Sequence, residues 1–265
     1  MCCYVVDHVT GVTQLHDVVY VVCGRSSKIS RFNATTHERL TDINVNDLRW
    51  PRDIAACEQT SHVYVADYME CVWRVSSDGA DMKHWLPKSP SDTMRPSALS
   101  VTSSRLLVTS RDNKQLIQFD AAGVELRRVL LPDYMKPGHA VESPTGTFIV
   151  CHCNDELNQF QVNEVDAEGQ VLRQFSGSRL VLTYWYPPHI AVDSRGNIFV
   201  ADSSSRRILL LDAQLALRRI IIDEHQLNDK EPLQLCYNEQ SGQLLVSFDD
   251  SVAVFDAGPA PGFCR

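Results

Sequence analysis

The chain repeats one short pattern six times, and this repetition limits the possible folds more than any other feature of the sequence. The copies read "VYVVCG", "VYVADY", "LLVTSR", "FIVCHC", "IFVADS" and "LLVSFD". Successive third-position valines lie 44, 43, 42, 50 and 46 residues apart. A period in this range is typical of propeller blades. The six valines are Val21, Val65, Val108, Val150, Val200 and Val246.

Two further markers recur in step with the valines. About ten residues after each valine, an apolar run ends at a turn residue, as in "IQFD" and "LLLD". An apolar position precedes each valine by 9 to 11 residues, and in five units a proline stands three residues before it. Each unit also has a fourth, less regular β run, such as Glu125–Leu131 or Leu217–Ile222. Four short strands per unit predict a twisted antiparallel sheet, which buries both faces only when several sheets stack around an axis.

The sequence therefore predicts an all-β fold, a six-bladed β-propeller of four-stranded antiparallel blades that forms a single domain over residues 1–265. The last unit ends after "SVAVFDAG" without a fourth strand. We expect the N-terminal segment Cys2–Val6 to supply that strand and close the ring, which also removes an exposed strand edge. The expected blades are 7–46, 47–91, 92–133, 134–178, 179–228, and 229–265 plus 2–6.

Composition narrows the class of partner and compartment. The chain carries a formal charge of -8, so binding to a polyanion would need a locally basic face. No apolar run approaches the roughly 18 residues of a membrane span, and the N-terminus lacks a signal-peptide pattern. Nine cysteines at irregular spacing make a poor disulfide framework. We expect a cytoplasmic domain that is monomeric in isolation and makes no membrane contact.

Two stretches resemble NHL repeats almost throughout. They are "PPHIAVDSRGNIFVADSSSRRILLLDAQ" (187–214) and "PRDIAACEQTSHVYVADYMECVWRVSSDG" (51–79). The other copies have drifted, with Cys23, Ser110, His152 and Phe248 in place of the Asp of V-A-D. The resemblance covers the whole chain and implies a six-bladed propeller. NHL propellers are known as C-terminal domains of tripartite-motif (TRIM) proteins, where one face binds protein partners or single-stranded RNA. Similar rings also serve as lyases and metal-dependent hydrolases, so the fold selects no function.

The sequence predicts no catalytic residue, no metal and no cofactor. Asp67 and Asp202 recur with the repeat, so we interpret them as carboxylates that hold the blade turns. His139 and His189 share a slot near the axis with Asp53, and such a set could bind zinc. The other units hold Gly11, Ala98 and Gln234 there, which departs from the ligand sets of lactonase-like propellers. No nucleophile elbow, phosphate loop or H-E-x-x-H motif is present.

The remaining candidate is a binding face. By the resemblance, the loops before the inner strands and the loops between second and third strands lie together. Exposed arginine and aromatic side chains are typical interface anchors and also stack on bases. We therefore expect a non-catalytic module that binds a protein or peptide, with any ubiquitin-ligase activity in an upstream TRIM-like module. Single-stranded RNA binding and a metallohydrolase or lyase remain alternatives. The expected binding residues are Trp50, Arg52, Tyr68, Arg95, Arg111, Lys136, His139, Tyr184, Trp185, Tyr186, His189, Arg206 and Arg207.

Overall fold

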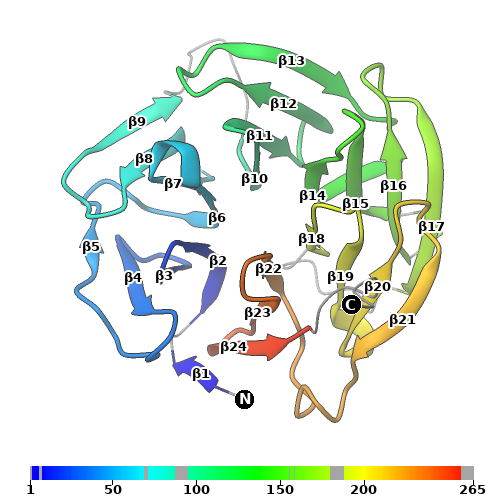
Figure 1. Cartoon of the computed structure of the whole chain (residues 1–265). Coiled ribbons are helices and arrows are strands. Elements are labelled where there is room, and N and C mark those ends of the chain that lie inside the picture. Colours follow the sequence, from blue (N-terminus) through cyan, green and yellow to red (C-terminus); the bar gives the residue numbers. More distant parts are fainter. Residues whose placement is uncertain are drawn as a thin grey trace.

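The computed structural model describes residues 2–5, 8–68, 71–86, 95–154, 156–157, 159–179 and 188–257. Their strands form six four-stranded antiparallel sheets that stand like blades around a central axis (Figure 1). The innermost strand of each sheet points its edge toward this axis, and the outermost strand lies on the rim (Figure 1). The six-bladed all-β propeller predicted from the repeat is confirmed.

The first three blades follow the chain in order from the axis to the rim. Blade 1 consists of β2 (Val9–Leu15), β3 (Val18–Cys23), β4 (Lys28–Asn33) and β5 (Ile43–Asn44). Blade 2 consists of β6 (Pro51–Cys57), β7 (His62–Asp67), β8 (Cys71–Ser76) and β9 (Met82–Leu86). Blade 3 consists of β10 (Ala98–Thr102), β11 (Arg105–Ser110), β12 (Gln115–Phe119) and β13 (Glu125–Leu130).

The last three blades continue in the same way, except that the final one borrows its outer strand. Blade 4 consists of β14 (Met135–Glu142), β15 (Phe148–Asn154), β16 (Gln159–Val165) and β17 (Val171–Arg179). Blade 5 consists of β18 (Ile190–Val192), β19 (Ile198–Asp202), β20 (Arg207–Leu211) and β21 (Leu217–Ile222). Blade 6 consists of β22 (Gln234–Asn238), β23 (Gln243–Ser247), β24 (Ser251–Asp256) and β1 (Cys2–Val5).

Helical structure in the described part of the chain is limited to two short 3-10 turns, η1 (Glu58–Thr60) and η2 (Ser203–Ser205). Among the residues described, no helix reaches the length and apolarity that crossing a bilayer requires. The polypeptide therefore places its functional side chains on strands and on the loops that join them.

The N-terminal strand closes the ring, as the sequence predicts. Strand β1 pairs antiparallel with β24, from Cys2 opposite Val254 to Val5 opposite Ser251. Figure 1 shows the N-terminus next to β24, so the first and last strands of the chain share one sheet. The pairing satisfies the edge of β24, whose backbone groups would otherwise be open to another chain.

The core lies between neighbouring sheets. Each of the six repeat valines has an exposed fraction of 0%. One apolar cluster joins Tyr64 of blade 2 to Leu106 and Val108 of blade 3, so a blade becomes buried only against its neighbour. The outer strands face water instead, and four of the first five residues of β13 and of β21 are exposed. The alternation of buried centre and exposed rim explains why the fourth run of each unit is the least regular in sequence.

The aspartate that ends the apolar run in three of the units holds the turn that follows. Asp120, Asp166 and Asp212 follow the third strands of blades 3, 4 and 5. In each case one carboxylate oxygen accepts hydrogen bonds from the backbone N–H groups two and four residues further on. These carboxylates hold the turn that leads to the outer strand, a known use of Asp in turns.

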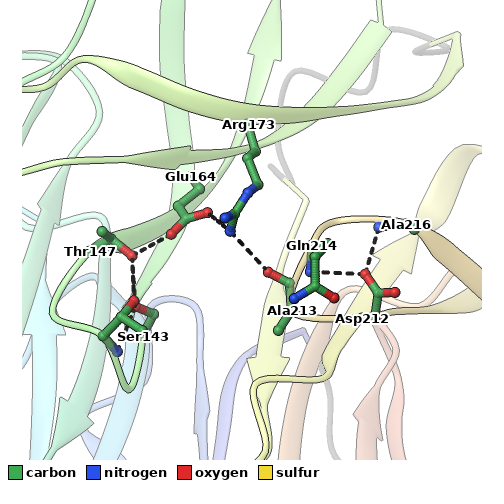
Figure 2. A network of polar contacts seen from close by, with 9 residues as sticks. Ser143, Thr147, Glu164, Arg173, Asp212, Ala213, Gln214 and Ala216 are labelled. Carbon is green, nitrogen blue, oxygen red and sulfur yellow. Dashed lines mark hydrogen bonds and ion pairs between the residues drawn. The ribbon is translucent and has the colours of Figure 1, made fainter.

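Buried carboxylates also join neighbouring blades. Figure 2 shows Glu164 of blade 4 between two donors, with Oε1 accepting from Thr147 Oγ1 at 2.8 Å and Oε2 accepting from Arg173 Nη1 at 2.7 Å. The same Arg173 nitrogen reaches the carbonyl oxygen of Ala213 in blade 5 at 3.5 Å. Glu164 is only 5% exposed, and its partners supply the hydrogen bonds that a buried carboxylate needs.

Candidate functional site

A cavity of about 480 Å³ opens at one end of the propeller axis. It is lined by residues that begin the inner strands and by loops between second and third strands, so these two sets of loops share one face, as expected from the NHL resemblance. We call it the cationic mouth. Its charged lining consists of four cations and one carboxylate, namely Arg52, Arg111, Lys114, Lys136 and Asp112.

A second cavity, of about 570 Å³, lies at the opposite end of the axis. It is lined by the later parts of the inner strands and by the turns that follow them. We call it the acidic mouth, because no Lys or Arg is among its lining residues in the described part of the chain. Its carboxylates are Glu58, Glu142, Asp193 and Glu239. The propeller is therefore electrostatically polar along its axis.

Two guanidinium groups in the cationic mouth are not neutralised. Among the described residues, neither Arg52 nor Arg111 has a carboxylate within ion-pair distance. The Arg52 guanidinium carbon lies over the Tyr68 ring, 5.1 Å from the ring centre. The ring does not neutralise the guanidinium charge, and the guanidinium has five N–H donors to offer an anion.

The one carboxylate of the cationic mouth is already occupied. Asp112 accepts a hydrogen bond from the Tyr68 hydroxyl at 2.8 Å and lies 3.5 Å from an Arg95 nitrogen. The Arg95 guanidinium also approaches the Tyr68 ring, at 5.6 Å from its centre. Asp112 is thus neutralised by Arg95, and the positive charge of Arg52 and Arg111 remains.

A further cavity of about 730 Å³ adjoins the cationic mouth and shares Arg52 with it. It contains Trp50, 37% exposed, whose ring centre lies 4.9 Å from the Arg25 guanidinium carbon. The fully buried Asp67 holds this loop, since its carboxylate accepts from the backbone N–H groups of Arg49 and Trp50. The V-A-D carboxylate of blade 2 therefore positions a candidate binding residue, and it has the turn-holding role that the repeat predicts.

The two buried carboxylates of the acidic mouth are satisfied within the protein. Glu142, 8% exposed, accepts from Arg105 Nη2 at 2.9 Å and from Gln118 Nε2 at 2.7 Å. Asp193, 4% exposed, accepts from the backbone N–H groups of Arg195 and Asn197. These groups have their hydrogen-bond partners inside the fold, in contrast to the arginines at the other end.

Between the two mouths, polar side chains join the inner strands across blade boundaries. Asp53 Oδ1 accepts from the N–H of Ile54, and Oδ2 accepts from the N–H of Leu99 in blade 3, both at 2.8 Å. The carbonyl of Leu99 accepts from His139 Nε2 of blade 4 at 3.1 Å. One residue of β10 therefore links a carboxylate on one side to a histidine on the other.

The ring of contacts continues through blades 5, 6 and 1. His139 stacks on His189 with ring centres 3.7 Å apart, and His189 Nδ1 accepts from the N–H of Leu235 at 3.2 Å. The Gln234 amide donates to the Thr10 carbonyl. The Thr10 hydroxyl then donates to the carbonyl of Pro51 in blade 2 at 2.8 Å. We call Thr10, Asp53, His139, His189 and Gln234 the axial ring.

Burial controls the charge state of the axial ring. It raises the pKa of Asp53 to about 6, against the opposing effects of His139 and of the Leu99 and Ile54 N–H groups. Burial, together with a smaller effect of His189, lowers the pKa of His139 to about 3. Burial also lowers the pKa of His189 to about 3. At neutral pH both imidazoles are therefore uncharged, and each must have one protonated and one unprotonated nitrogen.

Asp53, His139 and His189 each offer one ligand atom within 4.8 Å of the others, so we tested whether they fit a zinc ion. His139 donates from Nε2 to a carbonyl, which leaves the lone pair of Nδ1 available, as a metal ligand requires. His189 does the opposite, because Nδ1 accepts from the Leu235 N–H and the proton must reside on Nε2, the atom that faces Asp53 at 3.9 Å. Two available ligands are fewer than zinc sites use, so the residues do not fit the ion.

The structure brings five of the expected binding residues together. Arg52, Tyr68, Arg111, Lys136 and His189 all line the cationic mouth. Arg95 lies beside it through its contacts with Tyr68 and Asp112, and Trp50 lines the adjoining cavity.

The other expected residues lie elsewhere. His139 lines the acidic mouth, on the far side of the His189 ring. Arg206 lies 3.8 Å from Asp229, and Arg207 Nε donates to the buried Asp202 carboxylate at 2.8 Å. Residues 184–186, which include Tyr184, Trp185 and Tyr186, are outside the described part of the chain.

Sequence reasoning missed Thr10. Together with Gln234, which the repeat does place near the axis, it completes the floor of the cationic mouth through blade-to-blade hydrogen bonds. The repeat also places Asp53 near the axis, where it is 1% exposed and belongs to the axial ring. In five of the six units a proline stands three residues before the inner apolar position and marks this level of the blade. The repeat therefore indicates which residues lie at this level, but their hydrogen-bond partners lie on other units.

No protein-family model matches the chain, and no curated protein matches it. Solved structures do. Hydrazine synthase of Kuenenia stuttgartiensis has a TM-score of 0.63 at 12% identity, with 93% of this chain and 95% of that chain covered. A catalytically inactive virginiamycin B lyase from Staphylococcus aureus, with quinupristin, has a TM-score of 0.65 at 14% identity, with 93% and 79% covered.

A nidogen/laminin complex is also similar, with a TM-score of 0.62 at 16% identity and with 83% of this chain and 81% of that chain covered. Identities this low establish the propeller fold and leave the NHL resemblance to the sequence pattern. The similar structures include enzymes and a protein complex, so the site has to decide the function.

Proposed function

We propose that this chain is a non-catalytic recognition module that binds an acidic segment of a partner protein at the cationic mouth. The observation that carries the proposal is the presence of two guanidinium groups, Arg52 and Arg111, in one cavity without an ion-pair partner among the described residues. Because the whole chain has a formal charge of -8, this positive mouth is a local feature. Complementary charge across an interface steers encounter and rejects partners of the wrong sign.

The contacts of the axial ring support a non-catalytic role. Asp53, His139 and His189 are the residues best suited to acid–base chemistry, and each is at most 7% exposed and hydrogen-bonded to a backbone group of another blade. A general base must come within reach of the substrate proton, whereas the lone pair that remains available, on His139 Nδ1, belongs to a side chain that is only 3% exposed. The ring instead joins the blades around the axis.

The NHL resemblance extends the proposal to the whole protein. In that setting the propeller would be the substrate-recognition domain of a TRIM-like ubiquitin ligase, with the ligase chemistry in a module outside this chain. A reducing, cytoplasmic location accords with the thiols of Cys57, Cys151 and Cys236, which form no disulfide.

Single-stranded RNA is the competing ligand, and the aromatic faces favour the protein partner. RNA binding in propellers and similar platforms relies on bases stacked on exposed rings. The Trp50 ring has the Arg25 guanidinium over it, and the Tyr68 ring has those of Arg52 and Arg95 within 6 Å of its centre. A base would have to displace these cations.

Selection from a random peptide library on the immobilised chain tests the proposal. We expect the bound peptides to be enriched in Asp and Glu, and the enrichment to disappear in the double variant Arg52→Gln, Arg111→Gln. The double variant Arg127→Gln, Arg219→Gln on the exposed outer strands β13 and β21 is the matched control, because it removes the same two charges away from the mouth. A selection without acidic enrichment, or one that the double variant leaves intact, would contradict the proposal. Tighter binding of an oligoribonucleotide would favour RNA.

A further inference from the structure

The cationic mouth has more positive charge than one carboxylate can match. Of the cations that line it, Lys114 pairs with Asp133, and the mouth's own carboxylate, Asp112, is shared by Tyr68 and Arg95. Arg52 and Arg111 have no ion-pair partner among the described residues. A side-chain carboxylate has one charge and two oxygens, and a single guanidinium pairs with both oxygens in the fork geometry. A ligand with one carboxylate would therefore leave either Arg52 or Arg111 without an anion.

The arrangement of the two arginines suits a group with more oxygens. Arg52 comes from the inner strand of blade 2 and is held by the Tyr68 ring, and Arg111 comes from the β11–β12 loop of blade 3. The backbone N–H of Arg111 donates to the Ser97 hydroxyl at 3.2 Å, which fixes the base of that side chain. Both side chains are partly buried. They approach the cavity from different blades, so they would contact different oxygens of one ligand group.

We infer that the anion bound at the cationic mouth is a phosphorylated serine or threonine side chain of the partner protein. The inference rests on the proposed function and specifies its ligand. A phosphoryl group carries nearly two negative charges and three acceptor oxygens, so it can engage both guanidiniums at once. Phosphorylation of the partner would then switch binding on.

The surroundings favour a single phosphate over the backbone of a nucleic acid. The cavity that adjoins the cationic mouth contains as many carboxylates, Glu231 and Asp249, as guanidiniums, Arg25 and Arg52. A phosphodiester chain that left the mouth in this direction would meet no excess of positive charge to neutralise its further phosphates. A peptide does not need such an excess, because its flanking residues can be neutral or basic.

The test compares three synthetic peptide libraries with identical degenerate flanks and with phosphoserine, glutamate or serine at one fixed position. Binding to the full chain is measured by fluorescence anisotropy. We expect the phosphoserine library to bind about tenfold more tightly than the glutamate library, the difference that one added charge-assisted hydrogen bond produces. The serine library should bind more weakly than both.

Charge-conserving variants separate a phosphate site from general attraction. Arg52→Lys and Arg111→Lys keep the charge but remove the planar fork, so each should reduce phosphoserine binding about tenfold and change glutamate binding much less. Arg219→Lys on the rim is the control and should change neither. Thermal unfolding of each variant verifies that the fold is intact.

The outcomes distinguish this inference from the proposed function. Equal affinity for the phosphoserine and glutamate libraries, with serine weaker, overturns the inference and leaves acidic-segment recognition standing. Equal affinity for all three libraries overturns both. An oligoribonucleotide that displaces the phosphoserine peptides at lower concentration than they bind would assign the mouth to nucleic-acid phosphate instead.

Discussion

The two mouths of the propeller have opposite charge, and they differ further in how the charges are used. At the acidic mouth, Glu142 and Asp193 are almost fully buried, and their oxygens accept hydrogen bonds from the protein itself. At the cationic mouth, Arg52 and Arg111 are partly exposed and have no ion-pair partner in the described part of the chain. Charged groups that have hydrogen-bond partners inside the protein stabilise the fold. Charged groups that line a cavity without an ion-pair partner are available to a ligand.

The axial ring between the mouths should make the fold sensitive to acid, and this is the largest expected effect. Burial lowers the pKa of His139 and His189 from 6.5 to about 3, so below pH 6.5 the unfolded chain binds more protons than the folded one and stability falls. Asp53 offsets part of this loss, because its raised pKa of about 6 lets the folded state hold an extra proton between pH 6 and 3.8. The net loss from pH 7 to pH 4 is roughly 4 kcal/mol.

Urea unfolding at a series of pH values measures this dependence. The variant His139→Asn removes one titrating group, so its free energy of unfolding should change less steeply between pH 6.5 and 4 than that of the unchanged chain. An equal slope in the two proteins would show that other groups cause the acid sensitivity.

Replacement of Asp53 by Ala should have the next largest effect. It leaves the buried N–H groups of Ile54 and Leu99 without acceptors, which costs about 3 kcal/mol. Asp53→Asn keeps one acceptor oxygen and should cost less. Asp112→Ala at the cationic mouth is the exposed counterpart, with an expected cost below about 1 kcal/mol. Equal losses for Asp53→Ala and Asp112→Ala would break the distinction between the ring and the mouth.

Loss of a carboxylate at the acidic mouth should weaken the fold without affecting the ligand. Asp193→Ala removes the acceptor for the N–H groups of Arg195 and Asn197 and should lower the free energy of unfolding by about 2 kcal/mol. Affinity for acidic or phosphorylated peptides should stay the same, as anisotropy would show. Weaker peptide binding by this variant would place the ligand at the wrong end of the axis.

Replacement of an arginine of the cationic mouth should change the free energy of unfolding least, although it should weaken peptide binding most. Arg111→Gln breaks no ion pair among the described residues, so the free energy of unfolding should change by less than about 0.5 kcal/mol. Peptide affinity should fall about tenfold, and its dependence on salt concentration should weaken. A large loss of stability would indicate that Arg111 has an internal partner and is not free for a ligand.

Much of the fold could be predicted from the sequence because a propeller repeats its local chemistry. The six valines mark the buried second strands, and Asp120, Asp166 and Asp212 mark the turns, since each role depends on neighbours within a few residues. Ring closure by the N-terminal strand followed from the count of strands in the last unit. Each of these features can be predicted from the repeat together with the requirement that apolar surface be buried.

The site could be predicted only in part. The loops that share a face were recognised, and Arg52, Tyr68 and Arg111 do meet in one cavity. His139 was placed with them, but stacking on His189 puts it on the opposite side of the ring. Whether a polar side chain faces a ligand or another blade depends on residues about 45 positions away, which local sequence does not specify.

The sequence by itself determined the number of blades, the strand that closes the ring and the residues that hold the turns, because each is a local property repeated six times. Only the tertiary structure decided which charges remain unpaired. Glu142 finds Arg105 across a blade boundary, whereas Arg52 finds an aromatic ring and keeps its N–H donors available. Pairing depends on where separate blades meet around the axis, and that placement makes one mouth part of the scaffold and leaves the other open to a ligand.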